Sequence, residues 1–270
     1  MIANYHTHTY RCGHAVGEDR AYVETAIQRG LKVLGFSEHV PMPFPDGHES
    51  GFRVPLRLLD DYMTSVLALR EEYRGDIDVR LGLEAEYYPD LFDAMLELIA
   101  PYPVDYMILG QHFNDSRETV YNPRMQLSHS ALEQYVDMVI AGMETGRFSC
   151  VAHPDLFHYA GPEKIYRREM GRLCRRAREL DVPLEINVLG LRTGRCYPNE
   201  TFWTMAGAEG CRAILGCDAH TPEDVADPGQ LEAAMAFARR VGVTAQARME
   251  LRKPFADEIR RGGSDRRVGS

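Results

Sequence analysis

The sequence predicts an α/β barrel, and three observations lead to this fold class. Short apolar runs rich in Val, Ile, Leu and Phe recur along the chain, and longer amphipathic stretches separate them. Such runs are typical of parallel strands buried on both faces, and the longer stretches are typical of crossover helices. The alternation repeats about seven times, and each run ends at a His, an acidic residue or an Asn. Because reactive side chains of an α/β barrel gather at the carboxyl ends of its strands, we expect one barrel with one reactive mouth.

The apolar runs place the expected strands at residues 1–5, 31–37, 79–83, 106–111, 148–152, 183–186 and 212–217. A last run at 243–249 either adds an eighth strand or only closes the barrel. Helices are expected at residues 19–29, 56–74, 91–100, 130–145, 164–180, 199–209 and 227–241. Asp19 is expected to cap the first helix, Pro55 precedes the second, and Gly30, Gly146 and Gly210 stand where helices should end.

The composition fits one soluble globular domain. The chain has 270 residues, 44% of them hydrophobic and 26% charged, and no Gly/Ser or Pro-rich linker interrupts the alternation. We therefore expect one domain over residues 1–256 and a disordered tail over 257–270, which is rich in Gly, Arg and Ser. No apolar stretch approaches the length of a membrane span and no signal peptide is apparent, so we expect a cytoplasmic protein without a membrane partner.

Charge and cysteine usage exclude further classes of protein. The net charge is −9, and no Lys/Arg run or basic stripe precedes the tail, so duplex nucleic acid is disfavoured as a partner. The six cysteines lack paired spacing, and we expect them to be reduced thiols. The sequence leaves the oligomeric state open.

A His-Thr-His motif gives the sharpest local indication of chemistry. His6 and His8 stand two residues apart at a strand end, so their side chains point to the same face and can hold one ion. Further clusters follow in order: RCGH at 11–14, SEH at 37–39, GLEAE at 82–86, GQH at 110–112, AHPD at 152–155, EINVLGLR at 185–192 and GCDAH at 216–220. So many histidines and carboxylates at the strand ends are best explained by a metal centre.

This ordered set resembles the PHP family, named for polymerase and histidinol phosphatase, and specifically its histidinol-phosphatase branch. The resemblance spans residues 6–220 and implies a distorted (βα)7 barrel that binds two to three divalent transition-metal ions, which the ligand types limit to Zn, Fe or Mn. It implies one ion on His6, His8, Glu84 and Asp218, a second on the bridging Glu84 with His112 and His153, and a third on His14, His39 and His220.

The resemblance also implies catalytic roles for Glu84, Arg192 and Asp218, and it places Arg192 at the family position of a phosphate-binding arginine. Some alternatives stay open. Arg195 is the competing phosphate clamp, and Arg192 would then pair with a carboxylate such as Glu185. Glu86 shares a strand face with Glu84 and is an alternative ligand. His14, also a substrate contact in this reading, is an ordinary loop residue if its loop does not fold back. Glu38, Asp155 and Asn187 are expected to orient the ligands.

The leading functional prediction is a metal-dependent phosphomonoesterase for a small phosphate ester, with L-histidinol phosphate first by resemblance and histidine biosynthesis as its setting. Hydroxide formed at a bridging water would attack phosphorus, and metal-bound water or Asp218 would protonate the leaving alcohol. A broader phosphoesterase acting on nucleotide or sugar phosphates or on phosphodiesters is the second prediction. A non-catalytic metal-binding scaffold is the third. Two long loops, 41–55 and 114–127, are expected to shape the substrate pocket.

Overall fold

The computed structural model describes residues 1–255, and the predicted tail lies outside these residues. Eight parallel strands form one sheet in sequence order: β1 Ala3–Asn4, β2 Val33–His39, β3 Asp78–Ala85, β4 Tyr106–Leu109, β5 Cys150–Val151, β6 Leu184–Asn187, β7 Ala213–Gly216 and β8 Ala245–Gln246. The helices are α1 Asp19–Gln28, α2 Leu59–Glu72, α3 Phe92–Ile99, α4 His129–Glu144, α5 Glu163–Glu179, α6 Val188–Thr193, α7 Glu200–Glu209 and α8 Pro228–Arg240. Short 3-10 turns occupy Tyr10–Cys12, Leu56–Leu58 and Pro222–Asp224.

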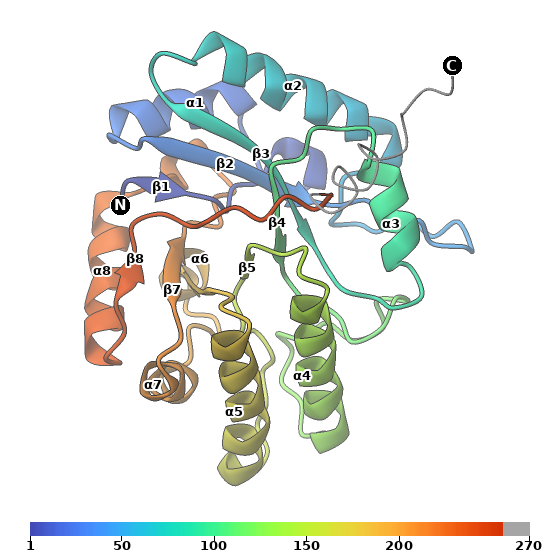
Figure 1. The fold of residues 1–270 in the computed structure, drawn as a ribbon, viewed down its shortest axis with the longest axis vertical. Helices are drawn as coiled ribbons and strands as arrows, with labels where there is room; N and C mark the ends of the chain where they lie inside the picture. Colours follow the sequence, from blue (N-terminus) through green and yellow to red (C-terminus); the bar gives the residue numbers. More distant parts are fainter. Residues whose placement is uncertain (256–270) are drawn as a thin grey trace, which may run out of the picture.

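The sheet curls into a barrel with helices around its outside (Figure 1). Beyond the ends of β1 and β7, Thr7 pairs in parallel with Ala219, and the His8 backbone N–H donates to the Ala219 carbonyl at 2.9 Å. This contact closes a ring of seven strands at the mouth. β8 pairs only with the first residues of β7, at the opposite end. The predicted distorted (βα)7 barrel is therefore confirmed, and the run at 243–249 contributes a short eighth strand.

A packed interior fills the barrel below the mouth. Tyr106 is fully buried there, and its hydroxyl donates toward the carbonyl oxygens of Tyr5 at 2.8 Å and Phe36 at 3.0 Å. Its ring needs a residue without a side chain beside it, because a Cβ at Gly82 would lie 2.3 Å from the ring. The filled interior leaves the carboxyl ends of the strands as the place for a site.

The predicted helices are all present, with two corrections. Asp19 does not cap α1: the N-cap residue is Glu18, and Asp19 instead accepts hydrogen bonds from the Arg11 guanidinium, at 2.8 and 3.0 Å, and from Ser65. The second correction is α6, a short helix directly after β6 that the sequence did not indicate. Within residues 1–255, the structure contains no helix with the length and hydropathy of a membrane span.

Candidate metal centre

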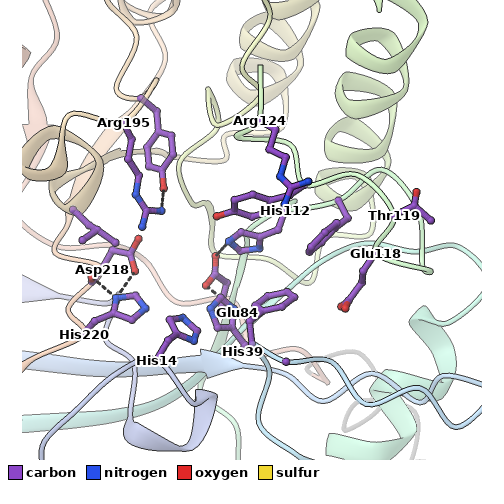
Figure 2. Close-up of a pocket in the computed structure, with 16 residues that line it drawn as sticks. His14, His39, Glu84, His112, Glu118, Thr119, Arg124, Arg195, Asp218 and His220 are labelled. Atoms are coloured by element: carbon purple, nitrogen blue, oxygen red, sulfur yellow. Dashed lines mark hydrogen bonds and ion pairs between the residues drawn. The ribbon is translucent and has the colours of Figure 1, made fainter. Parts of the chain in front are cut away.

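The carboxyl ends of the strands bring all the predicted ligands to one mouth, and Figure 2 shows those that line the cavity. His6 and His8 follow β1, His39 ends β2, Glu84 lies near the end of β3, and the remaining ligands follow β4, β5 and β7 or, for His14, the first 3-10 turn. Parallel pairing places His39 opposite Glu84 in register. Residues separated by more than 200 positions thus meet because each one ends or follows a strand of the same barrel.

His6, His8, Glu84 and Asp218 form a compact four-ligand group. The Nε2 atoms of His6 and His8 are 3.1 Å apart, and they lie 3.3 and 3.4 Å from Glu84 Oε2. The same two atoms lie 3.5 and 3.2 Å from Asp218 Oδ1. Ligand atoms about 2.0–2.1 Å from a tetrahedral ion are about 3.3 Å apart, so these separations match a tetrahedral site.

Glu84 faces a different group of histidines with each carboxylate oxygen. Oε2 lies within 3.4 Å of His6, His8 and His39, whereas Oε1 is 2.9 Å from His153 Nε2 and 3.7 Å from His112 Nε2. The carboxylate is 1% exposed, and neither oxygen has a hydrogen-bond partner among the described residues. Buried carboxylates are normally paired or coordinate metals, so this arrangement fits a carboxylate that bridges two cations.

Glycine makes room for this carboxylate. A Cβ at Gly110, just after β4, would lie 1.8 Å from Glu84 Oε1. Gly216 does the same for a second buried acid, since its Cβ would lie 1.6 Å from Glu185 Oε1. The glycines in the GQH and GCDAH clusters are therefore part of the site.

A third group of imidazoles lies beside the first. The ring centre of His14 is 4.8 Å from that of His220 and 5.6 Å from that of His39, so the first loop does fold back over the mouth. The ligand atoms of His8, His39 and His220 also lie within 4.8 Å of one another. Cys12 is near this group, but its thiol donates to the Thr9 carbonyl at 3.1 Å, and burial raises its pKa, which keeps it protonated.

Buried carboxylates hold the far side of three imidazoles. Glu185 contacts His6 Nδ1 at 2.7 Å, Glu38 contacts His8 Nδ1 at 3.1 Å, and Glu86 contacts His112 Nδ1 at 3.2 Å. Each carboxylate fixes the ring so that Nε2 faces the mouth. The contacts place Glu38 in its predicted orienting position. They make Glu86 a partner of His112, so that of the two glutamates Glu84 and Glu86 only Glu84 faces the other ligand atoms. Glu185, which the sequence suggested only as a partner for Arg192, belongs to this set.

The other two residues expected to orient ligands differ from each other. Asn187 donates to Asp218 Oδ2 at 3.0 Å and to Glu185 Oε2 at 3.1 Å, as expected of an orienting residue. Asp155 accepts a hydrogen bond from the Asn199 backbone N–H, at the start of α7, and contacts no ligand directly. Burial raises the pKa of Asp155 to about 7.

The backbone is strained at two of the ligands. His153 has φ +32° and Asp218 has φ +50°, a left-handed conformation that costs about 1–3 kcal/mol in residues other than Gly. Each residue lies two positions after the end of its strand, and its side chain faces the other ligands at the mouth. Such strain is typical of functional sites, where neighbouring structure holds the required direction.

Two carboxylates and two imidazoles of the site are in the protonation state that binds metal. Burial alone would raise the pKa of Glu84 and Asp218, but the surrounding imidazoles hold both well below the usual range, so both are anionic. Burial and the neighbouring His8 lower the pKa of His220 to about 4, and burial lowers that of His39, so both rings are neutral. His6 and His8 differ: burial opposes their protonation, but neighbouring carboxylates raise the pKa of both rings, so a metal must displace their protons. Imidazole with carboxylate is a donor set suited to Zn, Fe or Mn.

A cavity of about 690 Å³ opens above these ligands, and Arg195 lines it whereas Arg192 does not. The Arg192 guanidinium pairs with Asp224 at 2.6 and 3.0 Å, on the face of α6 turned toward α8. This arrangement argues against the predicted phosphate contact of Arg192. The open alternative, Arg195, hydrogen-bonds Tyr197 at 2.7 Å and lies near Asp218 (Figure 2).

Sequence reasoning missed several residues of the pocket wall. Glu118, Thr119, Tyr121 and Arg124 line the cavity from the long loop at 114–127, and Phe52 lines it from the other long loop. The length of these loops was the only indication in the sequence, and it did not identify individual side chains.

The family profile of the PHP domain matches residues 4–188 of this chain. The chain belongs to the PHP family. The matched segment contains the ligands from His6 to His153, whereas Asp218, His220 and Arg195 lie after it and are placed at the mouth by the structure. This membership confirms the resemblance seen in the ordered clusters.

Known relatives agree with that assignment. The chain is 29% identical over 240 residues to a probable histidinol-phosphatase of Deinococcus radiodurans, covering 83% of this chain and 88% of the relative. It is 28% identical over 260 residues to histidinol-phosphatase of Bacillus subtilis, covering 82% and 94%. The fold matches the crystal structure of histidinol phosphate phosphatase from Lactococcus lactis in complex with zinc, L-histidinol and phosphate, with TM-score 0.70, 21% identity and 93% and 97% of the two chains covered.

Proposed function

We propose that this PHP protein is a metal-dependent phosphomonoesterase that hydrolyses L-histidinol phosphate to L-histidinol and phosphate. The observation that carries the proposal is the position of Glu84, whose two oxygens face two separate groups of imidazoles at the bottom of one cavity. The names of the two curated relatives support the choice of substrate.

We assign the ligands to three ions, with Zn, Fe or Mn as the metals. His6, His8, Glu84 and Asp218 hold the first, Glu84 with His112 and His153 the second, and His14, His39 and His220 the third. When bound, such ions polarise a phosphate ester and lower the pKa of water. The chain itself supplies orientation: Glu185, Glu38 and Glu86 fix the imidazoles, and Asn187 fixes Asp218.

Arg195 is the residue that we assign to the phosphate. Arg195 is an exposed residue, and among residues 1–255 its guanidinium hydrogen-bonds only tyrosine, so it is available to an anion, and its planar fork suits two phosphate oxygens. Asp218 lies at the same end of the cavity, and its anionic carboxylate is the candidate to take a proton from water and pass it to the leaving alcohol.

The test combines metal content with substrate preference. Purified protein is expected to contain two to three equivalents of transition metal by elemental analysis, and chelation should abolish activity and lower the melting temperature. With Mn, Zn or Fe, kcat/KM for L-histidinol phosphate should exceed that for p-nitrophenyl phosphate and nucleoside monophosphates at least about tenfold. Equal values across the panel would favour the broader phosphoesterase, and metal content below about one equivalent would exclude this mechanism.

A further inference from the structure

Charged side chains line the pocket on two facing walls. Arg195 stands on the wall that also contains Asp218 and His220, whereas Glu118 stands on the far wall, in the same loop as Arg124, which also lines the pocket (Figure 2). Glu118 belongs to the part of this loop between Phe113 and Tyr121, whose ends are joined by an antiparallel bridge. The roles assigned above to Arg195, Asp218 and His220 explain the first wall, but none of them involves Glu118.

Buried charges hold Glu118 in place. Its Oε1 accepts a hydrogen bond from Arg53 Nε at 2.9 Å, and Arg53 also pairs with Glu86, the carboxylate that orients His112. The side chain of Arg53 is 2% exposed and that of Glu118 is 9% exposed. Glu118 Oε2 lies 3.2 Å from Nε2 of the exposed His48. Arg53 thus joins the two long loops to each other and, through Glu86, to the metal ligand His112.

This network has an excess of negative charge. Arg53 is the single guanidinium between two buried carboxylates, Glu86 and Glu118, so one negative charge is not balanced within the trio. A carboxylate oxygen accepts more than one hydrogen bond, so Glu118 retains acceptor capacity toward the cavity. A cation bound in the pocket would therefore gain a charge-assisted contact on this wall.

Aromatic rings surround the same part of the cavity. The ring centre of Phe52 is 5.6 Å from that of Phe113, and Phe113 is 5.5 Å from Tyr121. All three rings line the pocket together with Glu118. Aromatic faces attract cations and stack on flat rings, so this wall suits a cationic group carried on or beside a ring.

We propose that Glu118, with Phe52, Phe113 and Tyr121, binds the cationic end of the substrate and selects phosphate monoesters of cationic alcohols. The inference rests on the proposed phosphatase function, and it assigns the specificity of that function to named residues. Glu118 acts on binding of the alcohol portion, far from the phosphate contacts.

The experiment compares Glu118→Gln with wild type on three esters: L-histidinol phosphate, O-phosphoethanolamine and p-nitrophenyl phosphate. The first carries a cation and a ring, the second only a cation, and the third a ring without a cation. Glu118→Gln should reduce kcat/KM at least about tenfold for the two cationic esters, mainly through KM, and less than about twofold for p-nitrophenyl phosphate. Glu133→Gln removes the same charge from an exposed position on α4 and should change none of the three.

Inhibition measurements separate the subsite from general damage. Glu118→Gln should weaken inhibition by L-histidinol at least about tenfold and leave inhibition by inorganic phosphate unchanged. Equal losses on all three esters, or no loss on the cationic ones, would overturn the proposal, as would a wild type with no preference for cationic esters. If wild type ignored L-histidinol phosphate but cleaved O-phosphoethanolamine in a manner dependent on Glu118, the subsite would stand and the proposed substrate would be wrong.

Discussion

The two arginines that follow β6 give a direct test of the phosphate site. Arg195 lines the cavity and is exposed at its rim, whereas Arg192 pairs with Asp224 outside it. Removing one charged donor to a transition-state oxyanion costs about 2.7–4 kcal/mol in a site closed to water. Because Arg195 is exposed to solvent, we expect a smaller cost than this, about 1.4–2.8 kcal/mol, for Arg195→Ala. That range corresponds to a decrease in kcat/KM of about 10- to 100-fold.

Arg192→Ala should have the opposite profile. The change leaves the Asp224 carboxylate, 6% exposed, with only the backbone N–H groups of Thr221 and His220 at 3.2 and 3.4 Å. Arg192 is itself 30% exposed, so solvent screening reduces the loss to about 1 kcal/mol of unfolding free energy. The melting temperature should fall by about 2–4 °C, and kcat/KM should stay within about threefold of wild type.

Initial rates with L-histidinol phosphate, metal analysis and thermal melts on both variants decide the matter. Both variants should retain the metal content of wild type, since neither side chain contacts a ligand atom. If Arg192→Ala lost tenfold or more in kcat/KM while Arg195→Ala kept its activity, the orientation of α6 would not be the one that binds substrate, and the reasoning would be refuted.

Three further predictions concern the metal floor. Glu84→Gln should lower the metal content by at least one equivalent and reduce kcat in parallel, as measured by elemental analysis and rates; full metal content would contradict the bridging position. Gly110→Ala should do the same, because the new Cβ would lie 1.8 Å from Glu84 Oε1, whereas Gly75→Ala, with nothing within 4 Å of its Cβ, should leave both unchanged. Burial opposes protonation of His8, but neighbouring carboxylates raise its pKa to about 9, so metal binding at pH 7 should release protons, which calorimetry in buffers of different ionisation enthalpy detects. Because the pKa of His8 is raised in the folded state, protonation of His8 stabilises the metal-free protein fully below about pH 6.5, and this stabilisation should be lost as the pH rises through about 9. If the melting temperature of the metal-free protein rose between about pH 6.5 and about 9, this prediction would be contradicted.

The residues at the strand ends could be predicted because the carboxyl ends of all strands in a parallel barrel lie at the same face. An apolar run followed by His or Glu states both where a strand stops and which side chain stands at the mouth, so His6, Glu84 and His153 needed no knowledge of distant contacts. The left-handed backbone at His153 has no such signal, since nothing local in the sequence Ala-His-Pro requires it.

The position of Arg192 outside the cavity has a local cause. The segment after β6 is short, and no pattern in it indicates a helix. In the structure α6 places Val188, Leu191 and Arg192 on one face, at positions i, i+3 and i+4, and that face is turned toward α8. Gly194, with φ +65°, then ends the helix and returns the chain toward the cavity at Arg195. A single helical turn thus decides which of two arginines three residues apart lines the cavity.

The pairing of Glu118 with Arg53 could not be read from the sequence for a different reason. Both residues lie in long loops, where no periodicity fixes the direction of a side chain, and they are 65 positions apart. Only the folded loops show that one buried guanidinium serves two carboxylates.

The protein and a phosphate ester are both negatively charged, so the mouth of the barrel must supply positive charge for the ester to bind. A chain of net charge −9 that places Glu84 and Asp218, both anionic, at the floor of its pocket would repel a phosphate ester. Divalent ions on those carboxylates reverse the sign of the floor, and Arg195 adds to it at the rim. Glu118 adds a carboxylate on the opposite wall, away from the ligands that we assigned to the ions. A pocket with cations at one end and a carboxylate at the other orients a molecule that carries both a phosphate and a cation. An ester with only one of these charges makes only one of the two charged contacts.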